Sequence, residues 1–219
     1  MEVPRAPYPP VTVTAELDTP LSRWLWLVKW LLVIPHWIVL FFLWIAFLVV
    51  TVIAFFAILF TERYPRGLFD FNLGVLRWSW RVSYYSYGAV GTDRYPPFSL
   101  GPEPGYPARL DIAYPVRLSR SQVLVKWWLL AIPHYLILAF LTGGMRAGWW
   151  SGGLITLLAV IGAFALAFTS RYPRDLFDLV VGLNRWVLRV AAYASLMTDA
   201  YPPFRLDQGG EEPAGDDVL

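Results

Sequence analysis

The segment WLWLVKWLLVIPHWIVLFFLWIAFLVVTVIAFFAILF, residues 24–60, decides the fold class of this 219-residue chain. It runs for 37 residues with Lys29 as its one charged side chain. A straight helix of that length measures about 55 Å, whereas the hydrocarbon core of a bilayer is about 30 Å thick. The segment therefore predicts a membrane protein, and it is too long for a single straight span.

The composition of the whole chain agrees with a membrane protein. Hydrophobic residues make up 57% of the chain and charged residues 16%, against roughly 25% charged in an average soluble domain. The absence of cysteine excludes disulfides, thiolate metal sites and cysteine nucleophiles. A net charge of +2 gives no strong basic field, so no nucleic-acid partner is expected.

The sequence is an internal duplication, because three motifs recur in the same order. The motif pairs are LVKWLLVIPH (27–36) with LVKWWLLAIPH (124–134), TERYPRGLFDF (61–71) with TSRYPRDLFDL (169–179), and TDRYPPF (92–98) with TDAYPPF (198–204). These pairs indicate one repeat at 8–100 and a second at 106–206. The Pro- and Gly-rich stretch at 101–105 between them is typical of a linker.

The second apolar region, about 121–168, carries a ten-residue insertion relative to the first, about 24–60. The insertion lies near TGGMRAGWWSGG, residues 142–153, and insertions are best tolerated at exposed loops. A turn is therefore expected there and at the equivalent place in the first repeat, 43–46. Two topologies remain open for each repeat: a transmembrane helical hairpin, or an interfacial helix followed by one span.

The distribution of positive charge favours the hairpin. Of the 18 Lys and Arg residues, Arg146 alone would lie beyond the far ends of the spans. Because cytoplasmic loops carry an excess of Lys and Arg, the termini and the Arg-rich segments are expected on the cytoplasmic side of the plasma membrane. The predicted fold is an all-α integral membrane protein with two tandem repeats, related by a pseudo-two-fold axis along the membrane normal.

Other segments flank the predicted spans in each repeat. Residues 11–17 and 109–112 alternate with period two, so they are expected to be either paired strands or extended tethers. Each repeat then closes with an amphipathic helix, expected at about 66–90 and about 174–196, whose aromatic and Arg residues suit the headgroup layer. The acidic tail at 207–219 is expected to be disordered.

Four ionisable side chains lie in the apolar regions at equivalent places: Lys29, His36, Lys126 and His134. Ionisable groups within membrane segments are functional hypotheses by default. One hypothesis is a symmetric cluster at the repeat interface that carries a proton or binds an anion. The other is structural, with each Lys reaching the membrane surface and each His satisfying carbonyls freed by the neighbouring proline.

Arginines recur four residues apart on both closing helices, at Arg77, Arg81, Arg185 and Arg189. Like charges at that spacing repel on a helix, so a counter-charge is expected. Lipid phosphate is one candidate for it, and Asp93 or Asp199 is another. Two pairs of opposite charge are expected to be structural ion pairs near the helix starts: Arg66 with Asp70, and Arg174 with Asp178.

Motifs for catalysis are missing from the sequence. It contains no Walker A loop, no Gly-x-Gly-x-x-Gly and no Gly-x-Ser-x-Gly. We therefore expect no catalytic residue, no metal and no cofactor. The predicted function is a non-enzymatic scaffold or accessory subunit that binds anionic lipid and a larger membrane complex. The alternative is a small transporter or permeability factor that uses the paired Lys and His residues.

The repeated motifs, with RWSWRV at 77–82, resemble the domain-of-unknown-function 4389 family in its two-copy actinobacterial form. The resemblance covers about 8–206. It implies a membrane-associated protein and no established activity, so it informs the architecture and not the mechanism. The second repeat departs from the first at Asp175, which stands in place of Gly67, and at Ala200, which stands in place of Arg94.

Overall fold

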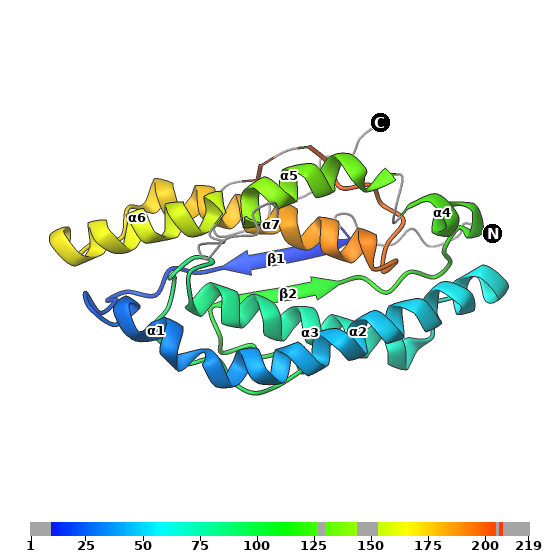
Figure 1. The fold of residues 1–219 in the computed structure, drawn as a ribbon, viewed down its shortest axis with the longest axis horizontal. Helices are drawn as coiled ribbons and strands as arrows, with labels where there is room; N and C mark the ends of the chain where they lie inside the picture. The colour runs from blue at the N-terminus through cyan, green and yellow to red at the C-terminus, as the bar shows by residue number, and fades with distance from the viewer. Residues whose placement is uncertain (1–9, 127–129, 144–152, 205, 208–219) are drawn as a thin grey trace.

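The computed structural model describes residues 10–126, 130–143, 153–204 and 206–207. The first repeat contains β1 (Val11–Ala15), α1 (Trp26–Leu32), α2 (Ile34–Thr61) and α3 (Arg66–Tyr85). The second contains β2 (Ala108–Ile112), α4 (Arg120–Val125), α5 (Ile132–Thr142), α6 (Leu154–Thr169) and α7 (Arg174–Ala194). The described chain is mostly helical, and its two halves have related element orders (Figure 1).

Helix α2 is continuous over 28 residues, whereas its counterpart in the second repeat is divided into α5 and α6. The start of α6 lies directly against the end of α5. A Cβ built on Gly153 would lie 2.1 Å from the carbonyl oxygen of Leu141 and 2.4 Å from the nitrogen of Gly143. Figure 1 shows α6 continuing the path of α5. The insertion lies in sequence between these two helices; its residues 144–152, including Arg146, lie outside the described part of the chain.

The turn expected at 43–46 does not exist, so the hairpin predicted for the first repeat is wrong. These four residues lie in the middle of α2. They include no Gly, Pro or Asn that would favour a reversal. An apolar segment also satisfies its backbone donors and acceptors most completely as an uninterrupted helix. The insertion in the second repeat marks a position where a helix accepts extra residues, and not a position where the chain turns back.

The two short strands form an antiparallel ribbon across the duplication. Their register pairs Val11 with Ile112, Val13 with Leu110, and Ala15 with Ala108. Val13 and Leu110 occupy the same position in the two repeats, so a pseudo-two-fold axis passes between them. The prediction that the two alternating stretches pair as strands is confirmed, and the extended tether is excluded.

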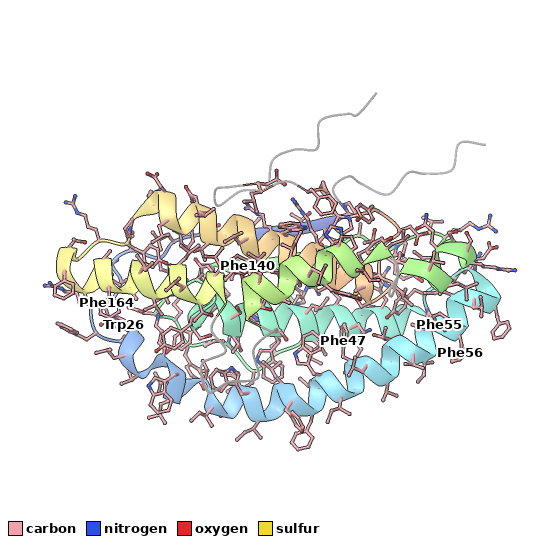
Figure 2. All side chains as sticks on the ribbon, turned by 45° about the horizontal axis from the view of Figure 1, so that its top comes forward. Trp26, Phe47, Phe55, Phe56, Phe140 and Phe164 are labelled. Carbon is pink, nitrogen blue, oxygen red and sulfur yellow. The ribbon has the colours of Figure 1, made fainter. Side chains whose placement is uncertain are left out.

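The helices cover one face of this ribbon in two layers. Helix α3 of the first repeat packs on β2 of the second, and α7 of the second packs on β1 of the first. Helix α2 packs on α3, and α6 packs on α7. Figures 1 and 2 together show α2, α5 and α6 on one side of α3 and α7, with the ribbon on the other side. A two-stranded ribbon is marginal on its own, so this exchange of helices between repeats stabilises it.

Helices α3 and α7 are largely buried between the outer helices and the ribbon, and so are not the exposed surface helices that were predicted. In α3 the buried side chains include Phe69, Leu76 and Trp80, and in α7 they include Phe177 and Val181. Their amphipathic pattern has another cause: their apolar side chains pack against the outer helices and the inner face of the ribbon, and Arg77 and Arg185 bind carbonyl oxygens of the ribbon. Helical periodicity identifies two faces, but it does not identify what covers them.

We expect Gly162→Ala in α6 to lower the free energy of unfolding by about 1 to 3 kcal/mol. A Cβ at Gly162 would lie 2.3 Å from Cζ and 2.5 Å from the hydroxyl oxygen of Tyr172, which is buried. Gly67→Ala in α3 is the matched control, because nothing lies within 4 Å of its Cβ position. Alanine there is expected to add up to about 1 kcal/mol of stability. Denaturant unfolding in mild detergent checks both changes, and equal effects would contradict the packing at Gly162.

Candidate functional site

Helices α1, α2, α5 and α6, which we call the apolar layer, expose large hydrophobic side chains. The most exposed include Trp30, Phe41, Phe42, Leu48, Phe60, Leu136, Phe140, Phe164 and Phe168. Helix α2 is the one helix in the described part of the chain that is long and apolar enough to span a membrane. Only 17% of its most apolar 18-residue stretch is buried in the protein, so α2 is not an ordinary core helix. Figure 2 shows Phe140 of α5 and Phe164 of α6 on the same side of the molecule.

The outer face of the ribbon is polar, in contrast to the apolar layer. Thr12 is exposed, and the side chains of Glu16 and Asp111 are 67% and 73% exposed. Arg109 pairs with Glu16 at 2.8 Å across the two strands. The protein therefore has one apolar face, formed by helices, and one charged face, formed by strands.

Lys29 is buried at the end of α1 and is bound within its own repeat. Its Nζ donates to the carbonyl oxygen of Thr92 at 2.7 Å and lies 3.0 Å from Oδ1 of Asp93. It also lies 4.8 Å from the centre of the Tyr85 ring. Burial lowers the pKa of Lys29, and the carboxylate of Asp93 opposes that effect. The amine is therefore held by groups of the protein itself.

Lys126 has the same environment in the second repeat. Its Nζ lies 2.7 Å from the carbonyl oxygen of Thr198 and 2.7 Å from Oδ1 of Asp199, and 4.8 Å from the Tyr193 ring centre. Burial likewise lowers the pKa of Lys126 against the effect of Asp199. Helices α1 and α4, where the two lysines lie, are at opposite ends of the molecule (Figure 1). The lysines therefore do not meet at the repeat interface.

Each histidine lies in an aromatic cage of its own repeat. His36 stacks on Phe98 with ring centres 4.0 Å apart, and its Nδ1 accepts a hydrogen bond from Nε1 of Trp78 at 3.0 Å. His134 stacks on Phe204 with ring centres 4.5 Å apart. Both histidines are buried. The structure thus brings neither His near the lysine of the other repeat, and no shared Lys and His cluster forms among the described residues.

The four arginines that were predicted to bind lipid headgroups, two on α3 and two on α7, bind groups of the protein. Arg77 donates to the carbonyl oxygen of Leu110 at 2.9 Å and pairs with Asp111 at 2.6 Å. Arg185 makes the equivalent contact from the other repeat, donating to the carbonyl oxygen of Val13 at 2.9 Å. These two carbonyls belong to the strand residues on the pseudo-two-fold axis, so each arginine joins its helix to the strand of the opposite repeat.

Arg81 and Arg189 are buried one turn further along. Arg81 donates to the carbonyl oxygens of Ser99 and Gly101, and Arg189 pairs with Asp207 at 2.7 Å. Because Arg81, Arg185 and Arg189 are at most 5% exposed, the prediction that they contact lipid headgroups is wrong. Their partners are backbone carbonyls and Asp207, and not Asp93 or Asp199.

The predicted ion pairs on the same helices differ between repeats. Arg66 and Asp70 form the expected pair at 3.3 Å. In the part of the chain that the structure describes, Arg174 and Asp178 form no ion pair. The two repeats therefore differ in charge pairing at the start of these helices.

The sequence did not lead us to predict two sets of ion-pair partners. The first is Asp93 and Asp199 as partners of the lysines, and the repeated Thr-Asp dipeptide before Tyr-Pro-Pro was a signal for it. The second is Glu62, which pairs with Arg117 at 2.6 Å and with Arg120 at 3.1 Å. Since Glu62 has no counterpart in the second repeat, repetition could not reveal it.

Within the described residues, no group of three or more His, Cys, Asp or Glu side chains is arranged to hold a metal ion. The titratable groups gather instead into the separate pairs described above.

Comparisons with known proteins supply a family for this architecture. A family model matches residues 23–99 and again 124–205. No curated protein and no solved structure matches the chain. The two matched regions together cover more than half of the sequence, and the chain belongs to the family described as Domain of unknown function (DUF4389), with two copies of its domain.

Proposed function

We propose that this protein is a non-enzymatic membrane scaffold or accessory subunit that embeds its apolar layer in one leaflet of a bilayer. The observation that carries the proposal is the exposure of α2, where Phe41 is 62% exposed and Phe42 is 64% exposed. Large exposed apolar surfaces mark membrane or protein interaction sites. Each such side chain gains about 1.5 to 3 kcal/mol when it leaves water.

The charged face of the ribbon favours an orientation in the membrane plane. If α2 crossed the bilayer, the ribbon, which lies between the ends of the outer helices in Figure 1, would sit near mid-depth. Glu16, Arg109 and Asp111 would then enter the hydrocarbon, where a charged side chain costs about 2.5 to 3.5 kcal/mol. In the plane, the apolar layer faces lipid and the ribbon faces water. The pseudo-two-fold axis then runs along the membrane normal.

The in-plane orientation also accounts for the charge distribution. It keeps all Arg-rich segments on one side of the membrane, and an excess of Lys and Arg is typical of the cytoplasmic side. The cytoplasmic leaflet of the plasma membrane carries anionic lipid, which attracts such segments. No second function is proposed, because the transporter alternative needs the Lys and His pairs at one interface.

Single cysteines test this orientation directly, since the chain has none of its own. Labels at Phe41→Cys on α2 and Thr12→Cys on the ribbon are compared in vesicles that carry a quencher on the lipid tails. Labels at Ser22→Cys and Arg63→Cys, before α1 and after α2, report the side of the membrane. We expect quenching at residue 41, none at residue 12, and equal access to residues 22 and 63 from one side.

Two results would overturn parts of this proposal. Access to residues 22 and 63 from opposite sides of the vesicle would mean that α2 spans the bilayer. An unquenched label at residue 41 would mean that the apolar layer does not contact lipid, and a protein partner would have to cover it.

A further inference from the structure

A cavity of about 470 Å³ lies where α6 ends and α7 begins. We call it the corner cavity. Its walls combine apolar side chains from Leu17, Leu21 and Leu166 with the cations of Arg171 and Arg174. Both arginines are exposed, and neither forms an ion pair with any described residue. A cavity with leucine walls and two unpaired guanidinium groups suits an amphiphile with an anionic group.

The equivalent corner of the first repeat lies where α2 ends and α3 begins, and a carboxylate there binds two arginines from the start of the second repeat. Glu62 follows α2, and its two oxygens bind Arg117 at 2.6 Å and Arg120 at 3.1 Å. Arg66 pairs there with Asp70 at 3.3 Å. At this end of the molecule, the protein therefore supplies its own anions.

The corner cavity lacks this carboxylate because Ser170 stands in the place of Glu62. The backbone is the same at both positions, with φ of 58° at Glu62 and 60° at Ser170. A glutamate would therefore fit at 170 without a change of fold. Arg174 also lacks the pairing of its counterpart Arg66, since Asp178 does not bind it in the described structure. The second corner therefore has Arg171 and Arg174, the counterparts of Arg63 and Arg66, without an acidic residue at position 170.

A buried tyrosine beside the same cavity also lacks its counterpart's hydrogen-bond partner. Tyr64, at the first corner, accepts a hydrogen bond from Nδ2 of Asn72 at 2.8 Å. Tyr172 stands at the equivalent position, lines the corner cavity and is 7% exposed. Its hydroxyl has no hydrogen-bond partner among the described residues. Val180 stands in the place of Asn72, so the α7 side chain that would supply this partner is missing.

We infer that the corner cavity binds the phosphate of an anionic phospholipid, with Arg171 and Arg174 as its ligands. Guanidinium groups bind phosphate oxygens in a bidentate manner. The lipid source is favoured over a free anion because the cavity opens beside the apolar layer, where Phe164 and Phe168 of α6 are 50% and 79% exposed. The acyl chains would lie along these side chains. This inference rests on the proposed embedding of the apolar layer.

The test uses the full chain reconstituted in nanodiscs that contain phosphatidylglycerol and phosphatidylcholine. Native mass spectrometry after release from the nanodisc reports which lipid stays bound. Arg171→Gln combined with Arg174→Gln is expected to lower the retention of phosphatidylglycerol about tenfold. Ser170→Glu, which restores the carboxylate of the first repeat, is expected to do the same, and Ser170→Gln is its uncharged control. Arg63→Gln with Arg66→Gln removes the same charge from the other corner and is expected to leave retention unchanged.

The outcomes separate this inference from the proposed embedding of the apolar layer. Quenching of the label at residue 41 measures that embedding independently. Normal quenching with equal retention in all variants would overturn the phosphate site alone. If Arg171→Gln with Arg174→Gln and Arg63→Gln with Arg66→Gln lowered phosphatidylglycerol retention equally, general surface charge would explain the retention. That result would also overturn the phosphate site. Loss of bound lipid on addition of inorganic phosphate would identify a free anion as the ligand and overturn the lipid assignment. Absent quenching in the unmodified protein would overturn the embedding and this inference with it.

Discussion

Lys126→Met is expected to lower the free energy of unfolding by about 3 kcal/mol, because it removes one partner of a buried ion pair. The Lys126 side chain is fully buried, and it binds both the Thr198 carbonyl oxygen and the carboxylate of Asp199. Without the amine, the carbonyl loses its donor and the carboxylate loses its counter-charge. The Asp199 side chain is 27% exposed, so water relieves part of the cost. Equilibrium unfolding in mild detergent, followed by tryptophan fluorescence, measures the change.

The double variant Lys126→Met with Asp199→Asn separates the lost charge pair from lost packing. Replacing both partners removes the unpaired charge, and a buried ion pair replaced as a whole is often close to neutral. We therefore expect the double variant to recover most of the stability lost by Lys126→Met. Lys29→Met, with and without Asp93→Asn, should repeat the result in the other half. A stability unchanged by Lys126→Met would mean that the amine is solvated at the membrane surface.

The duplication and the main segments could be predicted from the sequence because each leaves a repeated or periodic signal. Repeated motifs located the two halves, and helices were expected from residues 66 and 174, where α3 and α7 begin. Period-two alternation located both strands. Pairing across the repeats follows from geometry, because two copies of one short strand related by a two-fold axis satisfy each other's backbone groups.

The path of the outer helices could not be predicted in the same way. A run of apolar residues specifies burial in lipid or protein, but not whether the chain turns back within it. The insertion near residue 143 indicated an exposed position, and exposure is compatible with a loop that leaves a helix as well as with a hairpin. Continuity of α2 is favoured by backbone hydrogen bonding over 28 residues and by the lack of Gly, Pro or Asn at 43–46, whereas the repeat comparison pointed to a turn there.

The candidate sites depended on contacts between segments that are far apart in sequence. The spacing of Arg77 and Arg81 indicated that a counter-charge was needed, and Asp111 supplies one for Arg77. It did not indicate that the acceptors are carbonyls of the other repeat's strand and of the 99–101 segment. The corner cavity required the opposite kind of evidence, since it depends on a difference between the repeats: Ser170 stands where the first repeat has Glu62.

Arg185→Met is expected to cost about 3 kcal/mol of unfolding free energy, because a buried hydrogen bond to a charged group is lost and its acceptor stays buried. Arg185 is fully buried, and it donates to the carbonyl oxygens of Val13 at 2.9 Å and Asp207 at 2.7 Å. Methionine keeps the apolar stem and removes these donors. The change therefore weakens the attachment of α7 to β1, which joins the second repeat to the first.

Arg77→Met is the matched comparison, because Arg77 makes the equivalent contact to the carbonyl oxygen of Leu110. Its side chain is 19% exposed, so water can replace the lost donor, and the expected cost is about 1 kcal/mol. Denaturant unfolding of both variants in the same detergent gives the two values. A cost for Arg185→Met no larger than that for Arg77→Met would contradict the assignment of Arg185 as the buried link between repeats. Arg185→Lys should rescue little, since a single amine cannot reproduce the two directed guanidinium contacts that Arg185 makes to Val13 and Asp207.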